Sequence, residues 1–140
     1  MKVIYLDFFG VLFEPREKNF DQSNAGTNLN HPLLEFIEQA LKPKYTIGIL
    51  SNVSRDMLHR TLQERLSLFD LLVTSFETGF IKPEKEIFNL AIEKAGVVPQ
   101  EILFIDDLDT NIRSAKNLNI MTLLYTDFPS FTQEIKIYLK

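Results

Sequence analysis

The fold of this chain is decided by a short stretch close to its start. The stretch reads Val3-Ile4-Tyr5-Leu6-Asp7-Phe8-Phe9-Gly10-Val11. Its first four residues are a continuous apolar run of strand length, and Gly10 ends the pattern, which predicts a buried β-strand. Asp7 then lies at the carboxyl end of that strand, where open α/β sheets bind their ligands. A carboxylate in this position can attack phosphorus as a nucleophile.

A second strand-length run, at residues 45–50, also ends in polar residues. Ser51 and Asn52 follow it directly. A hydroxyl group and turn amides at the end of a strand can hold phosphate oxygens. This pair is therefore a candidate phosphate-binding site.

A third run, at residues 102–105, leads into the adjacent acids Asp106 and Asp107. Two neighbouring carboxylates at a strand end repel each other, and a bound Mg²⁺ is the usual remedy. Asp109 is expected to cap the helix that follows, and Asn111 is expected to orient the two carboxylates.

A lysine precedes another predicted helix. Lys82 is followed by Pro83, which suits the first position of a helix, and Gly96 ends the apolar pattern beyond it. Lys82 is thus expected to lie just outside a rigid element, as a fixed positive charge.

Strand and helix patterns alternate along the whole chain. Strands are expected at 2–7, 45–50, 71–75, 102–106 and 120–125, and helices near 32–41, 54–66, 84–95, 110–118 and 130–139. This alternation predicts an α/β fold with a five-stranded parallel sheet, right-handed crossovers and helices on both faces. The polar residues at the strand ends then converge on one edge of the sheet, which makes them a single site.

With these motifs in this order, the chain resembles the haloacid dehalogenase-like (HAD-like) hydrolase superfamily, in particular its phosphatase-type branch. The four motifs of that family correspond to residues 7–11, 50–52, 81–84 and 104–107. The resemblance implies a three-layer, Rossmann-like core that spans residues 1–140 as one domain. Larger relatives carry a cap domain between the first two motifs. Residues 14–30 here form only a short polar stretch, so a minimal or absent cap and an open site are expected.

The resemblance also assigns the metal site. Asp7 would be both the nucleophile and a ligand of Mg²⁺, and the backbone carbonyl of Phe9 would be a second ligand. Asp107 would be the other direct ligand. Asp106 is expected to act through a metal-bound water, because Mg²⁺ keeps several of its waters.

The remaining motifs would hold the phosphoryl group. The resemblance implies that the Ser51 hydroxyl and the Asn52 amide grip its oxygens. Lys82 would neutralise both Asp7 and the charge that develops during transfer. Asp7 and Lys82 are thus the expected catalytic residues.

Phe9 departs from the family pattern. Most phosphatases of the family carry an aspartate there, which protonates the leaving oxygen and then activates the hydrolytic water. A phenyl ring can do neither, and general acid–base help is worth about 10²–10⁴ in rate. Esters with poor leaving groups are therefore expected to react slowly. The histidines, His31 and His59, fall in none of the motifs.

Three functions remain open. The first is a Mg²⁺-dependent phosphohydrolase that works through an aspartyl-phosphate on Asp7. The second is a catalytically weak phosphate-binding or regulatory module that keeps its affinity for Mg²⁺ and phosphate. The third is a dehalogenase-like hydrolase, since relatives that cleave carbon–halogen bonds also carry an aromatic residue in place of the second acid. The pair Asp106 and Asp107 argues against the third, because that chemistry needs no Mg²⁺ and carboxylates repel a haloacid.

Composition narrows the partners. The 140 residues carry a formal net charge of −4 and no cysteine. With a pI near 5.2, no basic face is indicated for nucleic acid. No apolar run approaches 18 residues, and no signal peptide is evident, so a cytoplasmic protein without a membrane span is expected. The expected substrate is a small phosphorylated molecule or a phosphoprotein, and the oligomeric state stays open.

Overall fold

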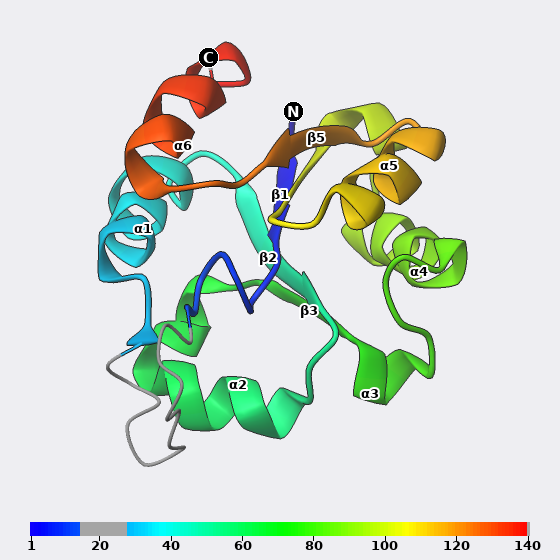
Figure 1. Ribbon diagram of the computed structural model, residues 1–140, viewed down its shortest axis with the longest axis horizontal. Coiled ribbons are helices and arrows are strands. Elements are labelled where there is room, and N and C mark those ends of the chain that lie inside the picture. Colours follow the sequence, from blue (N-terminus) through cyan, green and yellow to red (C-terminus); the bar gives the residue numbers. More distant parts are fainter. Residues whose placement is uncertain (15–27, 140) are drawn as a thin grey trace.

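The computed structural model describes residues 1–14 and 28–139 (Figure 1). Its centre is one five-stranded parallel sheet in the order β3-β2-β1-β4-β5. The strands are β1 (Val3–Leu6), β2 (Thr46–Ser51), β3 (Leu71–Thr74), β4 (Ile102–Asp106) and β5 (Met121–Leu124). The α/β fold with a five-stranded parallel sheet is therefore confirmed.

The register of the three central strands decides what meets at the edge of the sheet. Leu6 at the end of β1 pairs with Ile49 of β2 on one side and with Ile105 of β4 on the other. The backbone amide of Asp7 continues the ladder and donates to the Ile105 carbonyl at 2.9 Å. Because parallel strands end at the same edge, the residues that follow all three strands lie close together.

Helices cover both faces of the sheet. The main ones are α1 (His31–Phe36), α2 (Arg55–Leu62), α4 (Lys85–Ala95), α5 (Asp109–Asn117) and α6 (Phe128–Glu134). Ile4 and Leu6 share one core with buried residues of α1, α2 and α6, while Val3 and Tyr5 share the other with α4 and α5. The strand alternates its side chains between two faces, and both are buried, as the continuous apolar run predicted.

One glycine is required by close packing on the α4 face. Gly48 of β2 lies beside Tyr5 of β1, and a Cβ at Gly48 would come within 2.6 Å of the Tyr5 ring. The ring is thereby able to lie across β2, and its hydroxyl donates to the Ala91 carbonyl of α4 at 2.8 Å. Burial raises the pKa of Tyr5, so this hydroxyl keeps its proton at all ordinary pH values.

The predicted elements are all present, with differences at their ends. The first helix continues as a π-helical turn, η2 (Ile37–Leu41), and the second as a 3₁₀ segment, η3 (Gln63–Leu68). Two shorter 3₁₀ turns are η4 (Pro99–Glu101) and η5 (Ile135–Ile137). The short helix α3 (Ser75–Thr78) was not predicted, because four residues are too few to show a helical period.

Two residues do not take the roles predicted for them at helix starts. Pro83 does not open α4, which begins at Lys85 with Glu84 as its N-cap. Asp109 does not cap α5 but is its first residue; Leu108 is the N-cap, and the Asp109 carboxylate pairs with Arg113 one turn later. In both cases an acidic or prolyl residue favours the start of a helix at several neighbouring positions, so the sequence could not fix the exact one.

The described residues contain no cap domain over the edge of the sheet. Most of the polar stretch predicted at 14–30, namely residues 15–27, lies outside the described part of the chain. None of the helices in the described ranges is both long and apolar enough to cross a membrane.

Candidate active site

Three strand ends meet at one cavity of about 380 Å³. Asp7 follows β1, Ser51 is the last residue of β2, and Asp106 is the last residue of β4. The described residues that line the cavity are Asp7, Phe9, Gly10, Ser51, Asn52, Lys82, Asp107, Leu108 and Asn111. All the predicted site residues except Asp106 are in this lining, and Asp106 lies directly behind it.

Lys82 joins the carboxylates at the base of the cavity. Its Nζ lies 2.8 Å from Asp7 Oδ1 and 2.7 Å from Asp106 Oδ2, and the side chain is almost completely buried. The same ammonium lies 5.3 Å from the centre of the Phe104 ring. A buried charge is stable only where it is paired, so these contacts fix the ammonium between the two acids.

The backbone of Lys82 is held from β2. The Asn52 side chain accepts from the Lys82 amide at 2.8 Å and donates to the Lys82 carbonyl at 3.1 Å. Ser114 of α5 donates from its hydroxyl to the next carbonyl, that of Pro83, at 2.6 Å. Both polar atoms of the Asn52 side chain thus bind Lys82. The backbone amide of Asn52 is the group of this residue that could bind a phosphate.

Asp7 is held through one of its two carboxylate oxygens. Oδ1 accepts from the Phe8 amide at 2.8 Å, from the Ser51 hydroxyl at 2.7 Å and from Lys82. Every hydrogen bond recorded for this side chain within the described residues goes to Oδ1, so Oδ2 is open to a ligand. Burial raises the pKa of Asp7, and the positive charge of Lys82 only partly offsets it.

Asp106 differs because both of its oxygens are occupied. Oδ2 accepts from Lys82 and from Asn111 Nδ2 at 3.0 Å, and Oδ1 accepts from the Leu108 amide at 3.0 Å. The residue is fully buried. Asn111 therefore orients Asp106, which is one of the two carboxylates that it was predicted to orient.

Asp107 completes a group of three carboxylates. Ligand oxygens of Asp7, Asp106 and Asp107 lie within 4.8 Å of one another. Burial, together with the neighbouring acids Asp106 and Asp7, raises the pKa of Asp107 to about 6. Three carboxylates face a single ammonium, and such an all-oxygen set of excess negative charge fits a hard cation such as Mg²⁺.

Gly10 makes room for Asp107 and was not recognised as a site residue from the sequence. Its φ is +87°, and a Cβ there would come within 2.1 Å of Asp107 Oδ2. Any side chain at this position would therefore displace the carboxylate. The signal was present, since a glycine three residues after the candidate nucleophile stands in the motif that decides the fold.

Phe9 lies on the wall of the cavity. The residue is 38 % exposed, and its ring packs edge-on against Phe8 at 5.1 Å and against Phe13 at 5.6 Å between ring centres. His31 and His59 are exposed and do not line the cavity. Neither histidine therefore stands in for the missing acid.

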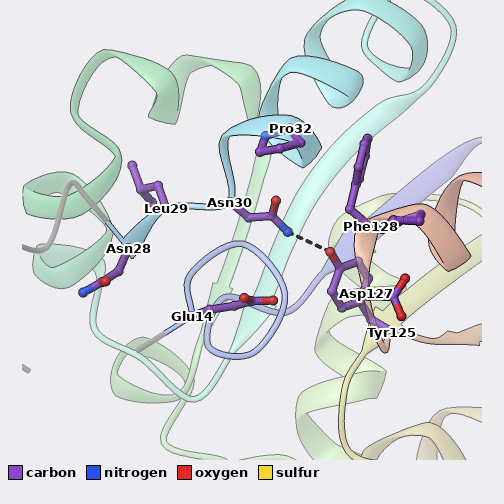
Figure 2. A pocket seen from close by; sticks show the side chains of 9 residues that line it. Glu14, Asn28, Leu29, Asn30, Pro32, Tyr125, Asp127 and Phe128 are labelled. Atoms are coloured by element: carbon purple, nitrogen blue, oxygen red, sulfur yellow. Dashed lines mark hydrogen bonds between the residues drawn. The ribbon is translucent and has the colours of Figure 1, made fainter. Parts of the chain in front are cut away.

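A second cavity, of about 420 Å³, lies next to the end of β5 (Figure 2). In it the Asn30 side chain donates to the Tyr125 hydroxyl at 2.7 Å and to the Val11 carbonyl at 2.9 Å, and it caps α1 by accepting from the Leu33 amide. Asn30 thus ties the loop after β1 to the start of α1 and to the segment after β5. The candidate site lies in the smaller of these two cavities, because Asp7, Asp107 and Lys82 line that one.

Comparison with known proteins identifies the family of the chain. The sequence profile of haloacid dehalogenase-like hydrolases matches residues 17–119. Bifunctional epoxide hydrolase 2 of Rattus norvegicus is 29% identical over 123 residues, covering 84% of this chain and 22% of that protein. D-ribitol-5-phosphate phosphatase of Bacteroides thetaiotaomicron is 29% identical over 107 residues, covering 71% of this chain and 52% of that enzyme. The chain therefore spans between about a fifth and about half of the length of these relatives.

Solved structures show the same fold. A predicted HAD-like family hydrolase from Porphyromonas gingivalis superposes with a TM-score of 0.76 at 20% identity, over 97% of this chain and 98% of that one. A HAD family enzyme from Bacteroides thetaiotaomicron, solved with magnesium and inorganic phosphate, gives a TM-score of 0.73 at 20% identity, over 94% and 98% of the two chains. Taken with the match of the family profile, these findings show that the chain belongs to the haloacid dehalogenase-like hydrolases.

Proposed function

We propose that this hydrolase is a Mg²⁺-dependent phosphohydrolase that works through an aspartyl-phosphate on Asp7. One observation carries the proposal: the buried ammonium of Lys82 bonds both Asp7 and Asp106 beneath a cavity onto which Asp107 also opens. The relatives support it, since one is named a D-ribitol-5-phosphate phosphatase and one solved structure holds magnesium and phosphate. A small phosphorylated molecule is the substrate that this reading favours.

The residues present fit the metal. The carboxylates of Asp7 and Asp107 and the backbone carbonyl of Phe9 would hold Mg²⁺ directly. Asp106 would reach it through water, because both of its oxygens already accept hydrogen bonds. When bound, the ion supplies positive charge to the phosphoryl oxygens and relieves the repulsion among the three acids.

The chain's own residues then account for the transfer. The Asp7 carboxylate attacks phosphorus, a bond forms from its oxygen to phosphorus, and the bond to the leaving oxygen breaks with its electron pair. Lys82, with its Nζ 2.8 Å from Asp7 Oδ1, favours the ionised form of this buried carboxylate. The Ser51 hydroxyl and the Asn52 amide would hold the equatorial oxygens. Water then hydrolyses the acyl phosphate, which releases inorganic phosphate and restores Asp7.

Phe9 sets the range of substrates in this mechanism. With no carboxylic acid at that position, the leaving oxygen departs as an anion or takes its proton from water. The missing acid–base help is worth about 10²–10⁴ in rate. Acyl phosphates and activated aryl phosphates should therefore react, and simple alkyl phosphates should scarcely react.

The same residue favours a second candidate function, a phosphate-binding module with little turnover. Apart from Lys82 and the proposed metal ligands, the described lining of the cavity offers no group with a proton to give near neutral pH. Such a module would bind Mg²⁺ and phosphate through the same residues. It differs from the enzyme only in the rate of transfer.

Assays of phosphate release and thermal stability test the proposal. The wild type should hydrolyse acetyl phosphate only with Mg²⁺, and Asp7→Asn should lose at least about 10⁴-fold in rate while staying folded. Mg²⁺ should raise the melting temperature by mass action, Asp107→Asn should lose that response, and Asp109→Asn, a matched exposed acid two residues away, should keep it.

The outcomes separate the three functions. Binding of Mg²⁺ and phosphate without turnover of any ester would favour the module. Release of halide from a haloacid without Mg²⁺, together with no response to Mg²⁺, would favour the dehalogenase. Full activity in purified Asp7→Asn would remove Asp7 from its proposed role.

A further inference from the structure

We propose that Phe9 and Leu108 form the binding site for the leaving group, and that the preferred substrates are aryl phosphates, the phosphate monoesters of flat apolar phenols. This inference rests on the proposed function and deepens it. It assigns to Phe9 a role in choosing the substrate, in place of the acid that other phosphatases of the family carry there.

Both side chains expose apolar surface inside the catalytic cavity. Phe9 is 38 % exposed and Leu108 is 54 % exposed, and both line the cavity together with Asp7 and Lys82. Phe9 follows β1 and Leu108 follows β4, which are paired neighbours in the sheet. When the phosphoryl group of an ester lies against Asp7, its leaving group can therefore extend over the apolar side chains of Phe9 and Leu108.

Neighbouring contacts hold the ring of Phe9 and the backbone of Leu108 in place. The Phe9 ring packs edge-on against Phe8 and Phe13, with interplanar angles of 74° and 87°. The backbone amide of Leu108 donates to Asp106 Oδ1 at 3.0 Å. A surface that is already ordered loses little conformational freedom when a ligand covers it, so it can bind a flat ring efficiently.

The charges around the cavity favour a neutral leaving group. Lys82 is the one cation among the described lining residues, and it is already shared by Asp7 and Asp106. A second anionic group on the substrate would find no free cation in this lining and would meet the negative charge of Asp107. Neutral, apolar groups suit the wall formed by Phe9 and Leu108 better.

The acidity of the leaving group also favours aryl phosphates. Phenols such as the tyrosine side chain have a pKa of about 10, well below that of an aliphatic alcohol, so an aryl oxide needs less help from a proton donor when it leaves. Phe9 thus both removes the acid that alkyl phosphates need and supplies a surface for esters that can do without it.

Binding of two non-hydrolysable probes tests the inference. Phenylphosphonate should bind the Mg²⁺-loaded wild type about 10-fold more tightly than methylphosphonate, as measured by calorimetry. Leu108→Ser and Phe9→Ala should each lose most of this preference while keeping the affinity for methylphosphonate. Ile137→Ser, which removes an 80 % exposed apolar side chain outside the cavity, should keep the preference.

Failure of the inference and failure of the proposed function give different results. If methylphosphonate binds and acetyl phosphate is hydrolysed, but phenylphosphonate binds no better, the leaving-group site is overturned and the phosphohydrolase stands. If neither phosphonate binds and neither acetyl phosphate nor phenyl phosphate is hydrolysed, both fail. Leu108→Ser decides the case should Phe9→Ala not fold, because Leu108 contributes little to the core. An unchanged preference in Leu108→Ser would contradict the role of this residue.

Discussion

The floor and the rim of the catalytic cavity are built in opposite ways. The floor, which we define as Asp7, Asp106 and Lys82, is at most 6 % exposed, and every member is held by ionic hydrogen bonds. The rim, which we define as Phe9 and Leu108, is 38 % and 54 % exposed and presents apolar side chains. The floor is thus held by the fold itself, whereas the rim is the part of the cavity to which we assign the choice of ester.

The difference has an energetic basis. A buried charge that loses its partner costs several kcal/mol, so we expect the floor residues to be required for stability as well as for the proposed chemistry. Exposed side chains contribute little to stability. Changes in the floor should therefore lower both the free energy of unfolding and the activity, and changes in the rim should alter activity alone.

The largest effect is expected from removing the cation of the floor. Lys82→Met would leave Asp7 and Asp106 buried without a counter-charge and should cost about 3–5 kcal/mol of unfolding free energy at pH 7. Urea denaturation measures this loss. Lys85→Met, which removes an exposed lysine three residues along the chain, is the control and should cost less than about 1 kcal/mol. Equal losses in the two variants would show that the floor is not held by its ion pairs.

The next largest effect is expected at Gly10, which lies against Asp107 between the floor and the rim. Gly10→Ala puts a Cβ 2.1 Å from Asp107 Oδ2, so the carboxylate must move and the thermal shift caused by Mg²⁺ should disappear. Gly79→Ala is the matched control, because Gly79 also has a positive φ, of +78°, but has open space around its missing Cβ. Both should lose about 1–2 kcal/mol from backbone strain, and Gly10→Ala about 1–3 kcal/mol more. A full Mg²⁺ response in Gly10→Ala would contradict the placing of Asp107.

The floor could be predicted largely from the sequence. Asp7 and Asp106 of the floor each end an apolar run of strand length, as the neighbouring Ser51 does, and parallel strands must bring such ends to one edge. Lys82 could be predicted to lie outside a helix, but no local pattern shows that its ammonium would bridge two acids. That contact depends on the Asn52 side chain, which binds the Lys82 backbone from 30 residues away.

The rim could not be predicted in the same way. Sequence patterns distinguish buried from exposed apolar residues through periodicity, and Phe9 and Leu108 lie in loops that have none. Local pattern does not separate Phe8 from Phe9; the family resemblance does, because it puts Phe9 where other members carry the acid that meets the leaving oxygen. In the structure Phe8 is fully buried and Phe9 lines the cavity. The roles proposed for the site residues stay predictions until the variants above are measured.

A smaller effect is expected from restoring an acid at the rim. Phe9→Asp should raise the turnover of alkyl phosphates by up to about 10²-fold, because a carboxylic acid could then protonate the leaving oxygen. Phe9→Asn is the control, since it is polar and similar in size to Asp but has no acid proton. Steady-state rates on an alkyl phosphate and an activated aryl phosphate measure the change. Equal rates in the two variants would mean that the backbone does not direct this side chain at the leaving oxygen.

The smallest effect is expected outside the site, at an ion pair exposed to solvent. Burial raises the pKa of Asp70, but hydrogen bonds from Lys42 and from the Ile47 amide outweigh it and lower the pKa below its ordinary value of 3.8. Because the folded state binds this proton less readily than the unfolded chain, the contribution is complete above pH 3.8 and is lost as the pH falls further, through the lowered pKa. Asp70→Asn should therefore cost less than about 1 kcal/mol at pH 7, and salt should reduce that cost. The urea midpoints of the wild type and the variant should differ by a constant amount above pH 3.8. Below pH 3.8 they should approach each other, as measured down to the lowest pH at which both proteins fold. A gap that stays constant there, or a loss as large as that of Lys82→Met, would break the contrast between the floor and the exposed ion pairs.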